Sequence, residues 1–120
     1  MKNTQPFFFL RLERRFERIN YSDIRYIQSS SNYCKIHLVD KMILTLVTLR
    51  QLEFALPSND FCRIHRSFIV RIEEITAFDH KAVDLGDIRL PLGETYQEEL
   101  ENRVQIVRTP EQQKAYINEV

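Results

Sequence analysis

The stretch Phe61-Cys62-Arg63-Ile64-His65-Arg66-Ser67-Phe68-Ile69-Val70-Arg71 decides how this chain is interpreted. It holds three arginines and a histidine in eleven residues and contains no acid. Its apolar residues at positions 61, 64, 68 and 70 anchor the stretch to a core, so the charged groups project in a fixed direction. Arginine forks match phosphate oxygens and the major-groove edge of guanine. An alternative stays open, in which Arg63 or Arg66 pairs with acidic residues later in the chain.

Length and composition predict one folded domain. The chain has 120 residues, of which 43% are hydrophobic and 28% charged, with only 2 glycines. These values exclude disordered, collagen-like and low-complexity chains. No apolar run approaches the roughly 20 residues of a membrane-spanning helix, and we expect neither a secretory signal nor a membrane partner. Two cysteines, Cys34 and Cys62, are too few for a disulfide framework, so we expect a cytoplasmic protein.

The net charge of zero conceals an asymmetry between the two halves. Residues 1–71 carry 12 Lys and Arg against 6 Asp and Glu (12 − 6 = +6), and residues 72–120 carry 5 against 11 (5 − 11 = −6). This split indicates one basic face that could meet an anionic partner. The alternative is a solvated surface with unevenly distributed charge.

Short strand-like runs dominate the chain and predict a mainly β protein with two short helices. The predicted turns lie at Arg14-Arg15, in the polar stretch 29–32, at Asp40-Lys41 and at Gly86-Asp87. We expect seven or eight strands among the nine runs 7–12, 15–19, 23–29, 33–39, 42–47, 61–71, 75–78, 83–85 and 88–90.

Two capping boxes predict the helices. The first is formed by Thr48 and Gln51, and leucines at positions 49, 52 and 56 follow on one helical face before Pro57. The second pairs Thr95 with Glu98 and precedes an apolar stripe at positions 96, 100 and 104. We expect both helices to pack on a sheet.

The sequence offers no catalytic motif and no cofactor site, so we expect a protein that is not an enzyme. Cys34-x-x-His37 and Cys62-x-x-His65 together supply two thiols and two imidazoles, which could suggest zinc. Both pairs lie in predicted strands, where residues i and i+3 point to opposite faces. We therefore expect no metal site and two small buried or half-buried thiols.

Several segments, in a fixed order, resemble one known family. The segment 19–29 reads I-N-Y-S-D-I-R-Y-I-Q-S, and it is followed by Asn32-Tyr33, by Thr48-Leu49-x-x-Leu52-Glu53-x-x-Leu56-Pro57 and by the block F-x-R-I-H-R-S-F-I-V that starts at Phe61. Leu90-Pro91-Leu92-Gly93, followed by Tyr96 and Leu100, completes the pattern. The order is similar to that of the LytTR (LytR/AlgR-type) DNA-binding domain of bacterial response regulators. The resemblance covers about residues 7–106.

This resemblance implies an elongated fold of several small antiparallel sheets that contacts DNA through loops. On this sequence the first loop brings Ser30, Ser31, Asn32 and Tyr33, with Cys34 and Lys35 at its end. The second contact is Arg66, with His65 and Ser67 holding the loop by hydrogen bonds rather than touching a base. Arg63 and Arg71 would add supporting positive charge.

The third contact departs from the family pattern, which often places a basic residue after the late proline. Here that position is Glu94, which would repel phosphate, although a carboxylate can accept a hydrogen bond from cytosine N4. Arg89 could supply part of the missing charge. The DNA-binding set implied by the resemblance is Ser31, Asn32, Tyr33, Lys35, Arg63, His65, Arg66, Arg71, Arg89 and Glu94.

We interpret residues 1–107 as a LytTR-like DNA-binding domain and residues 108–120 as a polar tail, either frayed or a short helix. The function implied is sequence-specific binding of double-stranded DNA by a bacterial transcription regulator of a two-component system. The implied partners are paired direct repeats, a second copy on DNA, and a receiver domain or sensor outside this chain, which would be an excised domain or a stand-alone regulator. The alternative is a protein-interaction or dimerisation module that kept this fold and lost DNA binding.

Overall fold

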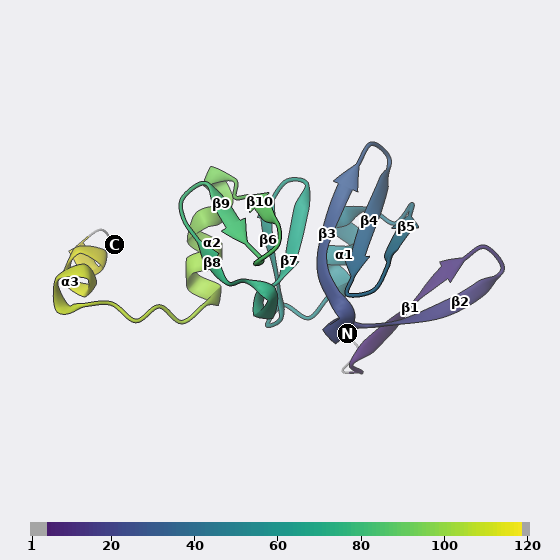
Figure 1. Ribbon diagram of the computed structural model, residues 1–120, viewed down its shortest axis with the longest axis horizontal. Helices are drawn as coiled ribbons and strands as arrows, with labels where there is room; N and C mark the ends of the chain where they lie inside the picture. Colours follow the sequence, from purple (N-terminus) through teal and green to yellow (C-terminus); the bar gives the residue numbers. More distant parts are fainter. Residues whose placement is uncertain (1–4, 119–120) are drawn as a thin grey trace.

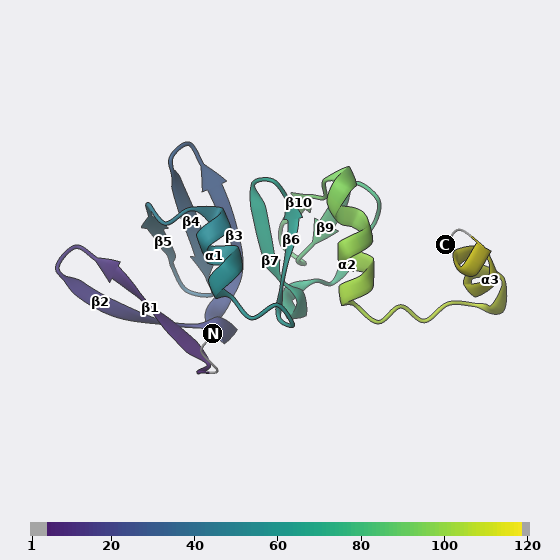
Figure 2. The same cartoon turned by 180° about the vertical axis from the view of Figure 1, so that it is seen from behind.

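Three small antiparallel sheets follow one another along the length of the molecule, as Figure 1 shows for this computed structural model. The structure describes residues 5–118, with side chains through residue 114, and measures 57 × 29 × 23 Å. Residues 1–4 of the predicted domain and residues 119–120 of the predicted tail lie outside the described residues. The segments are arranged almost linearly, with β1 (Phe7–Leu12) and α3 (Pro110–Asn118) far apart in both views (Figures 1 and 2).

The central sheet has five strands in the order β5-β4-β3-β7-β6, and every neighbouring pair is antiparallel. Its strands are β3 (Ile24–Ser30), β4 (Tyr33–Leu38), β5 (Met42–Thr45), β6 (Phe61–His65) and β7 (Phe68–Arg71). A two-residue turn at Ser31 and Asn32 joins β3 to β4, and Ser31 adopts the left-handed region with φ +57°. Strand alternation then places successive residues on opposite faces of this sheet.

One face of the central sheet packs under a helix and a hairpin. The helix α1 (Leu49–Ala55) is capped by the predicted box of Thr48 and Gln51, and its C-cap is Leu56. The hairpin consists of β1 (Phe7–Leu12) and β2 (Arg15–Asn20). Their apolar side chains meet the sheet in one buried cluster, which contains Leu10, Ile19, Ile27, Cys34, Ile36, Leu49, Leu52, Leu56 and Ile69.

The other face packs against the second half of the chain. A three-stranded sheet of β8 (Ala77–Phe78), β9 (Ala82–Asp84) and β10 (Arg89–Pro91) lies beside β6 and β7, followed by α2 (Gln97–Arg103). Their buried cluster contains Tyr26, Cys62, Ile64, Val70, Val83, Leu85, Leu90, Leu92 and Leu100. Short 3-10 helices cover Tyr21–Asp23, Ile72–Glu74 and Glu94–Tyr96 (η1, η2 and η3). Within residues 5–118, no helix is long and apolar enough to cross a membrane.

The structure confirms the mainly β prediction and most of the predicted turns. Cys34 and Ile36 share a buried face of β4, as alternation predicts. Gly86 adopts φ +99° in the turn between β9 and β10, where a side chain would be strained. The leucines of α1 and the stripe containing Leu100 point into the two clusters as predicted.

Four expectations about local structure are wrong. Residues 61–71 form a hairpin rather than one run, because Arg66 and Ser67 make a turn. No side chain caps α2: the chain enters it from η3, so Tyr96 rather than Thr95 precedes its first residue. The first turn is at Glu13 and Arg14, one residue earlier than predicted, with Glu13 at φ +58°.

The fourth is the number of elements. The described residues form ten strands rather than seven or eight, and three α-helices, which are the two predicted ones and one in the tail. The third helix, α3 (Pro110–Asn118), identifies the tail as a short helix rather than a frayed segment. In both views it stands apart from the sheets at the end of an extended segment (Figures 1 and 2).

Candidate nucleic-acid interface

Three segments that are distant in sequence lie at one edge of the molecule. They are the β3–β4 turn (31–32), the β6–β7 turn (66–67) and the segment 92–94, which we call the three-turn edge. Figure 1 shows the two turns and the start of α2 at the upper edge of the view. Two backbone hydrogen bonds align them: Ser29 N–H donates to the Ser67 carbonyl at 2.9 Å, and Gly93 N–H donates to the Ile64 carbonyl at 2.7 Å.

The β6–β7 turn is held from inside by Arg63 and His65. The Arg63 guanidinium donates to the carbonyls of His65 (3.1 Å) and Arg66 (2.5 Å), and it pairs with Glu53 Oε1 of α1 at 2.8 Å. The His65 ring accepts at Nδ1 from the backbone N–H of Ser67 at 3.1 Å. Arg66 itself is exposed at the tip. The contacts of Arg63 and His65 therefore fix the backbone that presents Arg66.

The alternative in which Arg63 pairs with later acidic residues is not observed among the described residues. The partner of Arg63 is Glu53, which belongs to the first half of the chain. Arg66 has no ion pair among the described residues, so its guanidinium is available to a partner.

The β3–β4 turn presents small polar groups. Ser31 and Asn32 are exposed, and Tyr33 and Ser30 flank them as a half-buried cross-strand pair. Lys35 is half-buried on β4 opposite Gln28, three positions after the last residue of the turn. Its backbone is therefore set back from the tip of the turn.

The segment 92–94 comes close to the backbone of β6. A Cβ atom at Gly93 would lie 2.9 Å from Cδ2 of Tyr96 and 3.7 Å from Cα of His65. Gly93 is therefore suited to this approach, because a larger residue would push the ring of Tyr96 away. Glu94 follows, exposed, at the start of η3. The third turn thus contributes a carboxylate to the three-turn edge.

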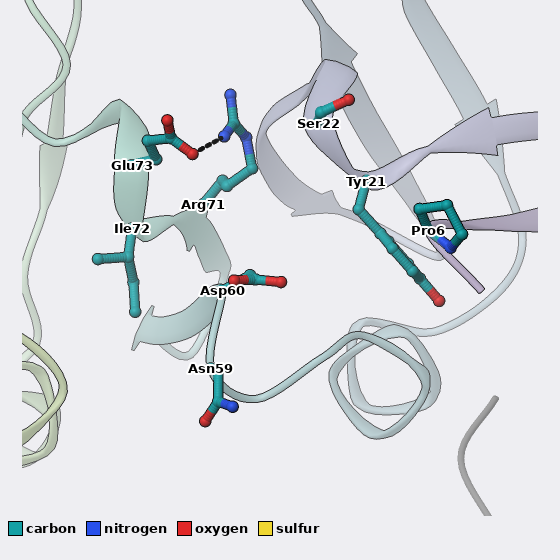
Figure 3. Close-up of a pocket in the computed structure, with 8 residues that line it drawn as sticks. All are labelled: Pro6, Tyr21, Ser22, Asn59, Asp60, Arg71, Ile72 and Glu73. Carbon is teal, nitrogen blue, oxygen red and sulfur yellow. Dashed lines mark hydrogen bonds and ion pairs between the residues drawn. The ribbon is translucent and has the colours of Figure 1, made fainter. Parts of the chain in front are cut away.

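Two of the predicted cations lie away from this edge. Arg71 is at the opposite end of β7, where it donates to the Ile24 carbonyl (2.7 Å) and pairs with Glu73 (3.0 Å) and Glu74 (2.9 Å). It lines an open pocket of about 400 Å³ with Tyr21, Asp60 and others, and its pair with Glu73 is visible in Figure 3. The structure thus gives Arg71 neighbours that neutralise its charge.

Arg89 is also paired, with Asp79 at 2.7 Å. It precedes Gly93 by four residues, which is roughly 13 Å of extended chain. A further arginine, Arg25, pairs with Glu74 (2.8 Å) and Asp87 (2.6 Å), and these partners raise its pKa. Two arginines of the basic first half, Arg25 and Arg71, are thus paired with acids of the second half. Arg66 and Lys35 are positively charged residues in or next to the two turns.

The two thiols lie on opposite faces of the central sheet, Cys34 in the cluster under α1 and Cys62 in the cluster under β8–β10 and α2. Burial raises the pKa of the Cys62 thiol to about 11 and also raises that of Cys34. Among the described residues, no group of three or more His, Cys, Asp or Glu side chains could hold a metal ion.

Sequence reasoning missed the residues that align the turns through their backbone: Ser29, Ile64 and Gly93. The scarcity of glycine was a usable signal, since Gly93 is one of two in the chain. It also missed that Arg63 holds a turn, because the pattern of the stretch shows its charge but not the folding back of its side chain.

Comparison with known proteins identifies the family. The model of the LytTr DNA-binding domain matches residues 14–105. The chain is 29% identical over 103 residues to the sensory transduction protein LytT of Bacillus anthracis, and 29% identical over 94 residues to LytT of Bacillus subtilis (strain 168). These matches cover 81% and 73% of this chain but 42% and 39% of the relatives, so the chain spans about two fifths of their length.

The fold agrees with that family. A solved LytTr DNA-binding domain, from a methyl-accepting/DNA response regulator of Bacillus cereus, superimposes with a TM-score of 0.71 at 19% identity. The superposition covers 85% of this chain and 99% of that domain. The chain therefore belongs to the LytTr DNA-binding domain family.

Proposed function

We propose that this chain binds double-stranded DNA sequence-specifically and serves, without catalysis, as the output domain of a cytoplasmic two-component transcription regulator. The observation that carries the proposal is the alignment of three turns at one edge by the two backbone hydrogen bonds. Membership of the family supports the DNA part of the proposal, and the relatives named as sensory transduction proteins support the regulatory part.

The width of the edge supports contact with more than one groove. In the strand order β4-β3-β7-β6, the β3–β4 turn and the β6–β7 turn are two strand spacings apart. Segment 92–94 lies next to β6, about one and a half spacings beyond the β6–β7 turn, so the three-turn edge is roughly 17 Å wide. The major groove is about 12 Å wide. An edge of this width is too broad for one major groove, as expected if its ends enter neighbouring grooves.

Each predicted residue then has a chemical role. Arg66 donates bidentately to a guanine edge, and Asn32 pairs with adenine from the neighbouring turn. Lys35 neutralises a phosphate, and the hydroxyl groups of Ser31 and Tyr33 donate hydrogen bonds to the DNA backbone. Glu94 accepts from a cytosine N4 or weakens binding by repelling phosphate.

Arg63 and His65 act in this proposal by holding the β6–β7 turn. Arg71 and Arg89 contribute positive charge only at long range, because both are paired with acids. We further propose that two copies occupy paired direct repeats, with input from a receiver domain or a sensor.

Fluorescence anisotropy with a pool of randomised duplexes, at about 50 mM and 200 mM salt, tests the proposal. We expect binding that weakens steeply with salt, because phosphate contacts release counterions. Selection and sequencing of the bound fraction should then enrich a spaced repeat. Absence of binding at low salt by a folded sample would reject the proposal and favour the interaction module.

A further inference from the structure

The β1–β2 hairpin has one face that packs on the protein and one that is open to solvent. Alternation along both strands places Leu10 and Ile19 on the inner face, where they join the first buried cluster. The outer hairpin face carries three phenylalanine rings, two guanidinium groups and one amide, at Phe7, Phe9, Arg11, Phe16, Arg18 and Asn20. Phe9 is 55% and Phe16 65% exposed, and the hairpin projects beyond β5 in both views (Figures 1 and 2). No element among residues 5–118 therefore covers these two rings.

The outer hairpin face is positively charged. Arg11 and Arg18 are exposed, and neither forms an ion pair among the described residues. The two acids of the hairpin lie elsewhere, Glu17 on the inner face and Glu13 in the turn, where the arginines at positions 15 and 14 accompany them. The uncompensated charge of the hairpin is therefore that of the two outer arginines.

The rings and guanidinium groups of this face are ordered against one another. The guanidinium carbon of Arg11 lies 5.7 Å from the centroid of the Phe16 ring, and that of Arg18 lies 5.1 Å from the centroid of Phe7. The rings of Phe7 and Phe9 meet edge to face with their centroids 5.8 Å apart. Cation–π contacts of this kind hold the arginines over the face. Each of the two exposed rings thus has a guanidinium group on the facing strand.

This combination fits a single strand of nucleic acid. Every base has a π-face that can stack on an exposed ring, and the phosphates between successive bases pair with cations. Phe9 and Phe16 are diagonal neighbours on the two strands, roughly 7–8 Å apart, so two bases of an extended strand can stack at the same time. A duplex keeps its base faces inside its own stack, so duplex DNA would match only the arginines.

We propose that the outer hairpin face binds single-stranded DNA. One base stacks on Phe9 and a second on Phe16, and the two arginines of the face hold phosphates. The choice of DNA rests on the proposed function, whereas the face itself requires neither a duplex nor the three-turn edge. Residues 7–12 precede the residues 14–105 that match the family model, so that match does not assign this face.

Fluorescence anisotropy of the full chain with a labelled oligothymidine of about 12 nucleotides tests the proposal. Phe9→Ala and Phe16→Ala should each lower the affinity by about 5- to 150-fold, the range for the loss of one stacked base. Phe54→Ala is the matched control, because Phe54 is 76% exposed on α1, outside the hairpin, and it should bind like the wild type. A wild-type protein that does not bind at about 50 mM salt, or hairpin variants that bind like the wild type, would overturn the proposal.

The salt dependence tests the role of the arginines. Arg18→Gln should weaken binding and reduce the salt slope by about 0.7, the value for one phosphate contact on a single strand. Arg50→Gln removes an exposed arginine of α1 and should leave the slope unchanged. An unchanged slope in Arg18→Gln would overturn the phosphate contact. Circular dichroism of each variant verifies that it is folded.

The fluorescence of an introduced indole reports stacking directly. The chain contains no tryptophan, so Phe16→Trp supplies the only one. Its emission should be quenched by the oligothymidine and much less by an oligonucleotide of the same length without bases. Phe54→Trp is the control and should be quenched by neither. Equal quenching of Phe16→Trp by both oligonucleotides would mean that phosphates alone are bound, which would overturn the stacking.

Binding to a duplex, measured with the same variants, separates this proposal from the proposed function. Phe9→Ala and Phe16→Ala should leave the affinity for a selected duplex unchanged. Equal losses on duplex and single strand would make the hairpin part of the duplex interface and overturn a separate face. A chain that binds the single strand through the hairpin but binds no duplex would keep this proposal and reject the proposed function. Tighter binding of an oligouridine of the same length would assign the face to RNA and overturn the choice of DNA.

Discussion

Arg63 is expected to affect DNA binding by holding a turn, and Arg63→Ala tests this. Its side chain is 19% exposed and donates to two carbonyls of the β6–β7 turn. Hydrogen bonds from charged groups contribute about 1.5–3 kcal/mol when buried, and we take about 2 kcal/mol for these two partly exposed bonds together. The ion pair with Glu53, which is 47% exposed, adds less than about 1 kcal/mol.

A loss of about 2 kcal/mol shifts the population of the ordered turn by about 30-fold, and the affinity falls by up to the same factor. Anisotropy with a selected duplex at several salt concentrations measures both the affinity and its salt slope. The slope should remain that of the wild type, because no phosphate contact is lost. Glu53→Gln is the control, and it should change the affinity by less than about fivefold.

Two results would refute this reasoning. A salt slope reduced by about one in Arg63→Ala would mean that Arg63 contacts phosphate directly. Unchanged affinity would mean that the turn either keeps its shape without the guanidinium or lies outside the interface.

Four other substitutions test separate parts of the account. Arg66→Ala should cost about 1–3 kcal/mol of binding free energy and relax specificity at one base pair, as measured by competition with variant duplexes; equal loss on random DNA would leave Arg66 as a phosphate contact only. Glu94→Lys should raise the affinity for DNA and steepen its salt dependence by about one unit of slope. An unchanged slope would mean that residue 94 does not lie near a phosphate. Leu100→Ala should lower the free energy of unfolding by about 2–5 kcal/mol in urea titrations, because Leu100 is fully buried in the second cluster; a loss below about 1 kcal/mol would show that the cluster repacks. Burial lowers the pKa of His37, with a smaller contribution from the charge of Lys35, and the His37 ring stacks on that of Tyr26 with the centroids 4.1 Å apart. The stability that His37 contributes should therefore be complete above pH 6.5 and decline as the pH falls below that value. His37→Phe should remove part of this dependence, and urea midpoints that vary identically with pH in both proteins would contradict the assignment.

The sequence predicted the elements whose signals are local. The capping box at Thr48 and the leucines of α1 need only neighbouring residues, and both were found. The residue pattern alone did not predict the β6–β7 turn, because Arg66-Ser67 contains neither glycine nor proline, and only the family resemblance implied a loop there. The cap of α2 was assigned wrongly because Thr95 has the right spacing, but Gly93 starts a 3-10 turn first.

For the candidate site, the sequence predicted only residues that lie in the motif of the family. Arg66 and Asn32 were found from the motif, and the structure places both at exposed turns. The alignment of the turns depends on backbone bonds from Ser29 and Gly93 to distant strands, and no local pattern encodes these. The ion pair of Arg89 with Asp79, ten residues away, forms only after folding, whereas Arg71 pairs with Glu73 and Glu74, which are its neighbours in sequence.

The central claim is that the three-turn edge is the DNA-binding surface, and amide chemical-shift mapping by NMR tests it most directly. The labelled chain would be titrated at low salt with a short duplex, either selected or random, since phosphate contacts engage the same surface in both. The account predicts shifts at residues 31–35, 65–67 and 92–95, with little change in the turn at Gly86 and Asp87. Shifts concentrated on β8–β10 or on the β1–β2 hairpin, with the three turns unchanged, would contradict it.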